Sequence, residues 1–182
     1  MNDKIGNRTY QALKNLYLNS KEMQDETIKL GFRENDQLAF AKEYCTIKLC
    51  GPRRSGHSEA IAKFIKEYYA GNWAIITINL HNSEFMRERI RWELQKPNSK
   101  CNFNPTIYKL TASNITIKNG PDISTIHLMS NHTFDYELKG LNLTGIIVDC
   151  ASFLSKSKME ELYRVGMPCM YAHKYQFFIF VE

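Results

Sequence analysis

The stretch that most constrains this chain is CGPRRSGHSEA, at residues 50–60. Gly51 and Gly56 stand at the spacing of the phosphate-binding pattern G-x-x-x-x-G-K-[ST]. His57 replaces the lysine of the pattern, and Ser58 matches its hydroxyl position. An apolar run precedes the loop and a helical pattern follows it. In that setting, backbone N–H groups can surround phosphate oxygens at a helix N-terminus. The alternative is that both glycines are ordinary turn residues that match by chance.

The order of apolar patterns along the chain predicts the fold class. Apolar runs typical of strands cover residues 45–50, 72–80, 143–150 and 175–182, and helical patterns lie between them at 58–70, 83–96 and 157–165. This alternation predicts a three-layer α/β fold with a mostly parallel sheet and right-handed connections. Residues 106–138 instead carry short β-type runs separated by turn residues, which predict a small β-rich insertion or edge hairpin.

The first part of the chain reads as helical. Apolar spacing predicts helices at residues 4–19 and 20–30, and a third at 37–44 after the break at GFREND. We expect one domain, residues 1–182, in which residues 1–44 form an N-terminal helical segment and residues 45–182 form the nucleotide-binding core.

Composition narrows the class of protein. Of the 182 residues, 43% are hydrophobic and 24% are charged, which is typical of a globular chain and not of a disordered one. The chain lacks a signal-peptide pattern and any apolar run of the ~20 residues that a membrane span needs. The five cysteines form no C-x-x-C pair, so we expect free thiols, a cytoplasmic location and no membrane partner. The net charge of +5 permits DNA or RNA as a partner without requiring it.

A second motif is the apolar strand GIIVD, which ends in Asp149. Ligands of open α/β sheets bind outside the carboxyl ends of the strands, so this acid should lie near the loop. A carboxylate there, with the hydroxyl of Ser58, is a donor set suited to Mg²⁺. The two motifs together predict a nucleotide site.

These motifs carry a resemblance to a known family. LCGPRRSGHSEAIAKFI together with GIIVDCASF resembles the ATPase domain of phage large terminases and the related helicase-type P-loop NTPases, over roughly residues 31–182. The resemblance implies binding of ATP or another nucleoside triphosphate with Mg²⁺, a catalytic role for Asp149, and phosphate contacts from Gly51, Arg53, Arg54, Ser55, Gly56, His57 and Ser58. It also implies that Gln37 reads adenine, unless Gln37 is simply an exposed helical glutamine.

The chain departs from the family's pattern in ways that bear on catalysis. His57 replaces the lysine, and a histidine of ordinary pKa is mostly neutral at pH 7, although bound phosphates would raise its pKa. Cys150 follows Asp149 where the family has its catalytic glutamate. We therefore expect slow or absent hydrolysis, unless another acid serves as base: Glu59, Asp122, Asp135 or Glu182. We also expect no nuclease domain of the kind that a terminase carries.

The segment SEFMRERIRWELQK predicts a basic helix. Arg87 and Arg91 lie four residues apart on one face, and Lys96 follows. Arg89 lies off that face, and Trp92 is interleaved with the arginines, so this helix could bind the phosphates of nucleic acid and stack on its bases. One of the arginines could instead reach the nucleotide of a neighbouring subunit, as an arginine finger does. The alternative is a solvated face on which Glu84, Glu88 and Glu93 pair with the arginines.

Three functions follow from these patterns. The first is a nucleotide-binding protein of viral DNA processing, in the host cytoplasm, with weak hydrolysis and with a larger packaging or replication ATPase, DNA or RNA, or further copies of itself as partners. The second is a non-enzymatic nucleic-acid-binding protein that retains the fold. The third is a small nucleotide or small-molecule kinase, against which the missing lysine and the lack of an arginine-rich lid argue.

Overall fold

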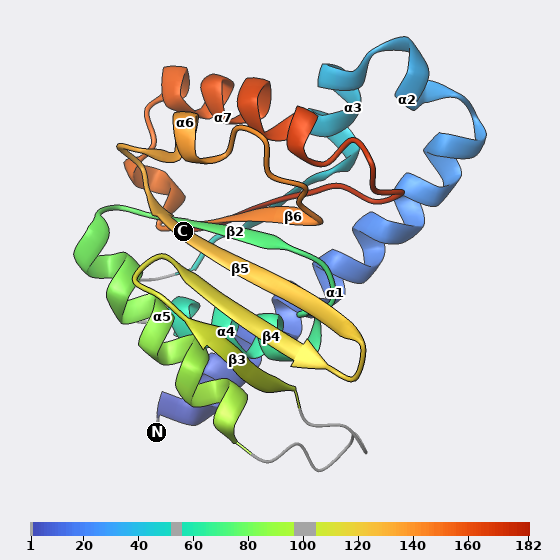
Figure 1. Ribbon diagram of the computed structural model, residues 1–182. Coiled ribbons are helices and arrows are strands. Elements are labelled where there is room, and N and C mark those ends of the chain that lie inside the picture. Colours follow the sequence, from blue (N-terminus) through green and yellow to red (C-terminus); the bar gives the residue numbers. More distant parts are fainter. Residues whose placement is uncertain (1, 52–55, 97–104) are drawn as a thin grey trace.

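A single sheet with helices on both faces organises the protein, as its computed structural model shows (Figure 1). The structure describes residues 2–51, 56–96 and 105–182. Within them the helices are α1 (Asn2–Lys29), α2 (Phe32–Asn35), α3 (Gln37–Tyr44), α4 (His57–Glu67), α5 (Leu80–Gln95), α6 (Phe134–Glu137) and α7 (Lys156–Cys169). The strands are β1 (Thr46–Leu49), β2 (Trp73–Thr77), β3 (Thr106–Leu110), β4 (Asn114–Asn119), β5 (Asp122–Ser130), β6 (Gly145–Asp149) and β7 (Phe177–Val181).

The described strands form one sheet in the order β1-β7-β6-β2-β5-β4-β3. The pairs from β1 to β5 are parallel, whereas β4 runs antiparallel to both β5 and β3. The parallel strands β2, β6 and β7 are buried at every residue. Strands of a parallel sheet are covered on both faces by helices, and this explains their continuous apolar sequences. The predicted α/β class with a parallel centre is confirmed.

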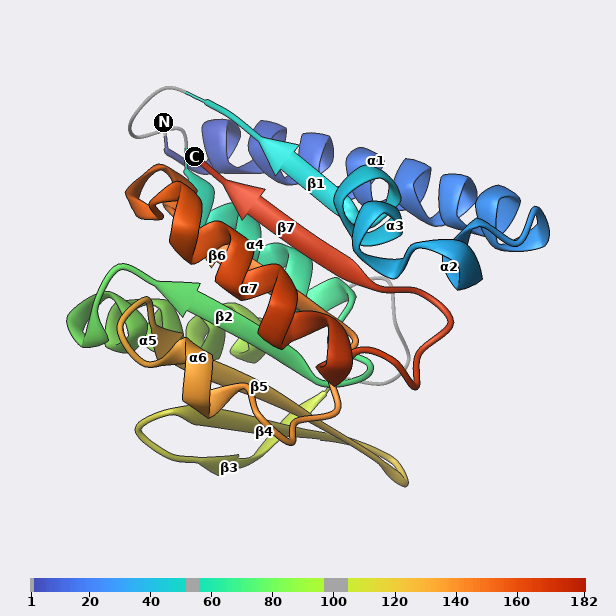
Figure 2. The same cartoon turned by 90° about the horizontal axis from the view of Figure 1, so that it is seen from above.

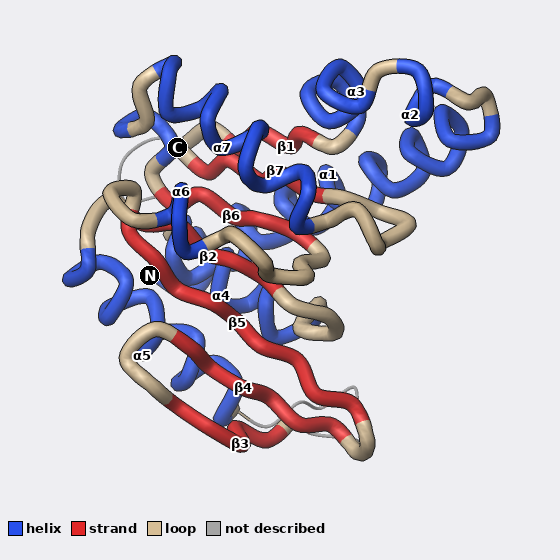
Figure 3. The backbone as a smooth tube through the Cα atoms, turned by 45° about the horizontal axis from the view of Figure 1, so that its top comes forward, coloured by secondary structure: helices blue, strands red, loops and turns tan. Residues whose placement is uncertain are grey.

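Helices cover both faces of the sheet, as Figures 2 and 3 show from different sides, and an apolar core fills the space on each face. One core lies between the sheet and α1, α4 and α5, and includes the fully buried Phe64 and Trp73. The other lies between the sheet and α3, α6 and α7, and includes Phe134 and Phe180. The side chains of α1 that join the first core are Tyr10, Leu13 and Tyr17, so this helix is part of a layer of the fold.

Several predicted boundaries were wrong. The two helices predicted within residues 4–30 are one helix, α1, which ends at Lys29. Asn19 and Ser20 are polar without being helix breakers, and the Ser20 hydroxyl donates to the carbonyl of Tyr44 at 2.9 Å. The second strand ends at Thr77, because the side chain of Asn79 caps α5 by accepting from the Asn82 N–H at 2.9 Å. The last helix extends to Cys169, beyond the predicted residue 165.

The region predicted as a β-rich insertion divides into two parts. β3 and β4 form the expected hairpin at one edge of the sheet, whereas β5 pairs in parallel with β2 and belongs to its centre. The carboxyl ends of β2, β5 and β6 therefore meet at one edge. Among the described helices, none combines the length and apolar character that a membrane span requires.

Candidate functional site

The two glycines of the loop are held by neighbouring elements. Gly51 donates its N–H to the carbonyl of Glu182 at 2.9 Å, which fixes the start of the loop beside the end of β7. Gly56 has a φ of +76°, in the left-handed region, and a Cβ there would lie 2.8 Å from the Cα of Gly6 in α1. Both the dihedral angle and the contact favour glycine. The predicted phosphate contacts Arg53, Arg54 and Ser55 lie outside the described residues.

The N-terminus of α4 is not capped by the side chain of its own N-cap residue, because that residue is Gly56. The N–H groups of a first helical turn lack partners within the helix and carry a partial positive charge, so they attract anions. His57 and Ser58 are the first two residues of this turn. The arrangement has the local chemistry of a phosphate site.

Ser58 and Asp149 come together from different elements. The Ser58 hydroxyl, on α4, donates to the Asp149 Oδ2 at 3.3 Å, at the carboxyl end of β6. Asp149 is only 7% exposed, and this burial raises the pKa of its carboxyl, while Ser58 and His57 oppose the shift. A buried carboxylate beside a hydroxyl gains from a cation, because the cation compensates the charge that water no longer solvates. The pair therefore fits Mg²⁺.

The His57 imidazole has a nitrogen that finds no partner in the part of the chain that the structure describes. Its Nε2 is buried and makes no hydrogen bond with the described residues. Burial lowers the pKa of His57, and the nearby Asp149 charge only partly offsets this. The imidazole is therefore neutral at pH 7. A buried nitrogen of this kind gains a partner if an acidic or polar ligand group enters the site.

Cys150 adopts an unusual backbone conformation beside the acid. Its φ is +61°, and its thiol donates to the Asp149 Oδ1 at 3.8 Å. Burial, and then the Asp149 charge, raise the pKa of this thiol to about 11. The thiol is therefore protonated at neutral pH and acts as a donor to Asp149, so it does not replace the proton-accepting carboxylate that the resemblance would place here.

The structure separates the acids that sequence reasoning offered as substitutes. Glu182 lies beside the loop, because its backbone pairs with Gly51 and Leu49. Glu59 is 8% exposed, is bound by Lys63 and packs on Gly6, so it is committed to the contact between α1 and α4. Asp122 begins β5, at the amino end of that strand and away from Asp149. Asp135, on α6, follows the carboxyl end of β5, and its Oδ1 is buried without a hydrogen-bond partner among the described residues.

Sequence reasoning missed Asn131. This residue follows β5 and donates its N–H to the carbonyl of Thr77 at 2.8 Å. Its Oδ1 is buried without a partner among the described residues, and it lines a narrow recess together with Asp149 and Cys150. The only signal available was an asparagine directly after an apolar strand, where ligand-binding residues of parallel sheets gather.

The remaining predicted contacts are not brought to this site. Gln37 begins α3 and lines a cavity with Met167, Tyr171 and Gln176, near the amino end of β7, whereas the loop follows the carboxyl end of β1. Arg87 donates to the carbonyls of Thr111 and Ala112.

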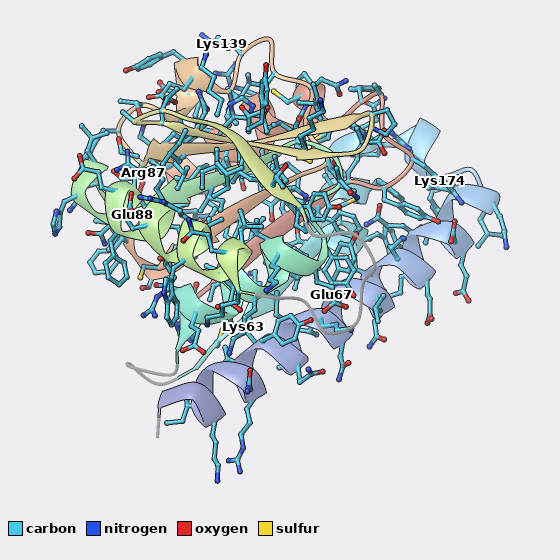
Figure 4. All side chains as sticks on the ribbon, turned by 60° about the horizontal axis from the view of Figure 1, so that its bottom comes forward. Lys63, Glu67, Arg87, Glu88, Lys139 and Lys174 are labelled. Carbon is cyan, nitrogen blue, oxygen red and sulfur yellow. The ribbon has the colours of Figure 1, made fainter. Side chains whose placement is uncertain are left out.

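Arg87 and Arg91 both pair with Glu88, and Lys96 pairs with Glu93, as the salt-bridged alternative for this helix predicts. Figure 4 shows Arg87 and Glu88 side by side on α5. These cations are thus engaged within the chain.

The fold defines a class: it is the P-loop-type α/β fold of terminase ATPase domains. No family model matches the chain, and no curated protein matches it. Among solved structures, the large terminase ATPase domain of Thermus phage P74-26 is similar, with a TM-score of 0.56 and 16% identity over 80% of this chain and 62% of that one. The large terminase of another, thermophilic bacteriophage is similar, with a TM-score of 0.54 and 11% identity over 79% of this chain and 36% of that one. The chain thus spans less than two thirds of either protein, and at these identities the likeness shows the fold alone.

Proposed function

We propose that this chain binds a nucleoside triphosphate, such as ATP, with Mg²⁺ at the N-terminus of α4. The hydrogen bond between Ser58 and Asp149 carries the proposal, because it puts a hydroxyl and a buried carboxylate beside the N–H groups of the first turn of α4. The backbone from Gly56 onward, with His57, would hold phosphate oxygens, and Ser58 and Asp149 would hold the metal ion. Arg53, Arg54, Ser55 and Gly51 complete the proposed loop contacts.

Mg²⁺ would supply charge that neutralises the phosphates, and the protein's own residues set how far the reaction proceeds. Asp149 orients the Ser58 hydroxyl, and the protonated Cys150 thiol donates to Asp149 and accepts no proton from water. The neutral His57 brings no permanent positive charge. Because charge stabilisation and water activation are both weakened, we expect nucleotide binding with slow hydrolysis.

The biological setting proposed here is viral DNA processing, in which DNA or RNA and a larger packaging or replication ATPase would be partners. The likeness in fold to terminase ATPase domains supports this setting. A chain that binds a nucleotide and turns it over slowly fits a regulatory or binding subunit better than a motor.

Calorimetric titration with a slowly hydrolysed ATP analogue, with and without Mg²⁺, tests the proposal. We expect Mg²⁺ to tighten binding in the parent, and Ser58→Ala and Asp149→Asn to remove most of that gain. Matched controls are Ser113→Ala, between β3 and β4, and Asp122→Asn, at the amino end of β5. Binding that ignores Mg²⁺, or equal losses in site and control variants, would contradict the proposed site.

A further inference from the structure

One face of α5 carries two large aromatic side chains that are more than half exposed. Phe85 is 54% exposed and Trp92 is 57% exposed. Arg89 and Lys96 lie on the same face, because residues three or four apart are neighbours on a helix. The Arg89 guanidinium is 5.6 Å from the centre of the Phe85 ring, and the Lys96 Nζ is 3.9 Å from that of Trp92. We call these four residues the α5 stripe.

The α5 stripe has no role in the core. The opposite face of the helix supplies the buried side chains Met86, Ile90 and Leu94. Two large aromatics that line up on one exposed helix face form an apolar surface that a ligand can cover. Phe85 and Trp92 lie about 10 Å apart along the axis at 1.5 Å per residue, so each ring can stack on a separate planar group.

The charges around the stripe favour an anionic ligand. Arg89 forms no ion pair with the acids in the described part of the chain, and the partner of Lys96 is Glu93, which is 5% exposed. The nearby acid Glu88 is engaged by both Arg87 and Arg91. The stripe therefore presents Arg89, a cation without an ion pair among the described residues, and Lys96, whose charge Glu93 partly compensates, beside the two aromatic faces.

We propose that the α5 stripe binds single-stranded nucleic acid. Unpaired bases can stack on Phe85 and Trp92, while the phosphates between them meet Arg89 and Lys96. A duplex offers its phosphates but keeps its bases stacked on each other, so it can use only half of this surface. This inference rests on the nucleic-acid part of the proposed function and uses none of the residues of the nucleotide site. It assigns the phosphate contacts to Arg89 and Lys96 in place of Arg87 and Arg91.

The two tryptophans of the chain make a direct test possible. Trp73 is fully buried, so quenching by a polyanion outside the protein should come from Trp92. We expect a 20-mer of oligothymidylate, without nucleotide or Mg²⁺, to quench the tryptophan emission of the parent. Trp92→Leu should abolish the quenching and weaken binding of a labelled oligonucleotide about tenfold, since one base stack is lost.

Matched variants separate the stripe from its surroundings. Phe85→Leu should weaken binding, whereas Phe32→Leu, at a phenylalanine of α2 that is 49% exposed, should not. Arg89→Gln should flatten the dependence of log affinity on log salt by about 0.7, the value for one phosphate contact with a single strand, whereas Arg91→Gln on the same helix should leave it unchanged.

Three outcomes would overturn the proposal. The first is that the parent does not bind the single strand at low salt. The second is that a duplex binds as tightly as the single strand and that Trp92→Leu does not change this binding. The third is that sedimentation velocity shows a dimer that Trp92→Leu dissociates. The last result would assign the stripe to a second copy of the chain. Loss of ATP binding with intact oligonucleotide binding would count against the nucleotide site alone.

Discussion

Gly6 of α1 lies directly against Gly56 at the N-terminus of α4. A Cβ on Gly56 would come within 2.8 Å of the Gly6 Cα, and a Cβ on Gly6 would come within 2.5 Å of the Glu59 side chain. The N-terminal helix therefore reaches the candidate phosphate site through backbone contact. Whatever enters that site meets an α4 N-terminus that α1 already holds in place.

This contact predicts the effect of Gly56→Ala. The left-handed conformation costs an alanine roughly 1–2 kcal/mol, and the clash with backbone atoms of Gly6 adds to that cost. Gly140→Ala is the matched control, because Gly140 also has a positive φ, +80°, but has open space around its Cβ position. Urea unfolding should show a larger loss of free energy for Gly56→Ala than for Gly140→Ala. Equal losses would mean that α1 yields easily at this contact.

Arg87 is predicted to be structural. Its guanidinium donates to two carbonyls, of Thr111 and Ala112, in the turn between β3 and β4. Arg87→Gln should therefore lower the free energy of unfolding by about 1–2 kcal/mol, since two acceptors lose a charged donor. Arg91→Gln should cost at most about 0.5 kcal/mol, because its ion pair with Glu88 is exposed. Thermal unfolding of the two variants compares them, and the reverse order would contradict this assignment.

His127 on β5 predicts a pH dependence of stability. Burial lowers the pKa of its imidazole, so the folded protein binds that proton less readily than the unfolded chain does. Its contribution is fully present above the ordinary histidine pKa and is lost as the pH falls through the lowered value. His127→Gln should therefore reduce the loss of Tm between pH 7 and acid, whereas His81→Gln, at an exposed position of α5, should not. Parallel Tm curves for His127→Gln and the parent would contradict the prediction.

The sequence predicted the parallel centre of the fold because burial on both faces demands continuous apolar runs. It also predicted that Ser58 and Asp149 lie near one another, because ligand-binding residues gather at the carboxyl ends of parallel strands. In the structure the Ser58 Oγ lies 3.3 Å from the Asp149 Oδ2. The position of Asn131 beside Asp149 was missed, because its one signal, an asparagine directly after an apolar run, is shared by many turn residues. The burial of Glu59 depends on Gly6, which is distant along the chain, so local patterns carry no trace of it.

The α5 stripe shows the same limit in another way. Spacing alone grouped Arg87 with Arg91, and that grouping is geometrically sound. What spacing cannot tell is which face of the helix is exposed, because this depends on where the hairpin of β3 and β4 lies. The turn of that hairpin engages Arg87, whereas Arg89 lies over the ring of the exposed Phe85.

The final prediction concerns the two departures from the pattern of P-loop ATPases. His57 withholds a permanent cation from the phosphates, and Cys150 is a protonated donor where a proton acceptor is expected. These defects affect different parts of phosphoryl transfer, one the charge and the other the attacking water. His57→Lys alone should therefore tighten binding of the triphosphate and leave turnover low. Cys150→Glu alone should change turnover little, because the charge is still missing.

The double variant, His57→Lys with Cys150→Glu, should release phosphate faster than either single variant, and a positioned base contributes about 10²–10⁴ in rate. Steady-state phosphate release from the parent and the three variants measures this, with Cys169→Ser as a control for loss of a thiol away from the site. The backbone at Cys150 is left-handed, with a φ of +61°, and a glutamate there could destabilise the fold. The Tm of each variant is therefore measured together with its rate. Rapid turnover by the parent with Mg²⁺ alone would show that another acid serves as base. Glu182, beside the start of the loop, would then be the first residue to replace.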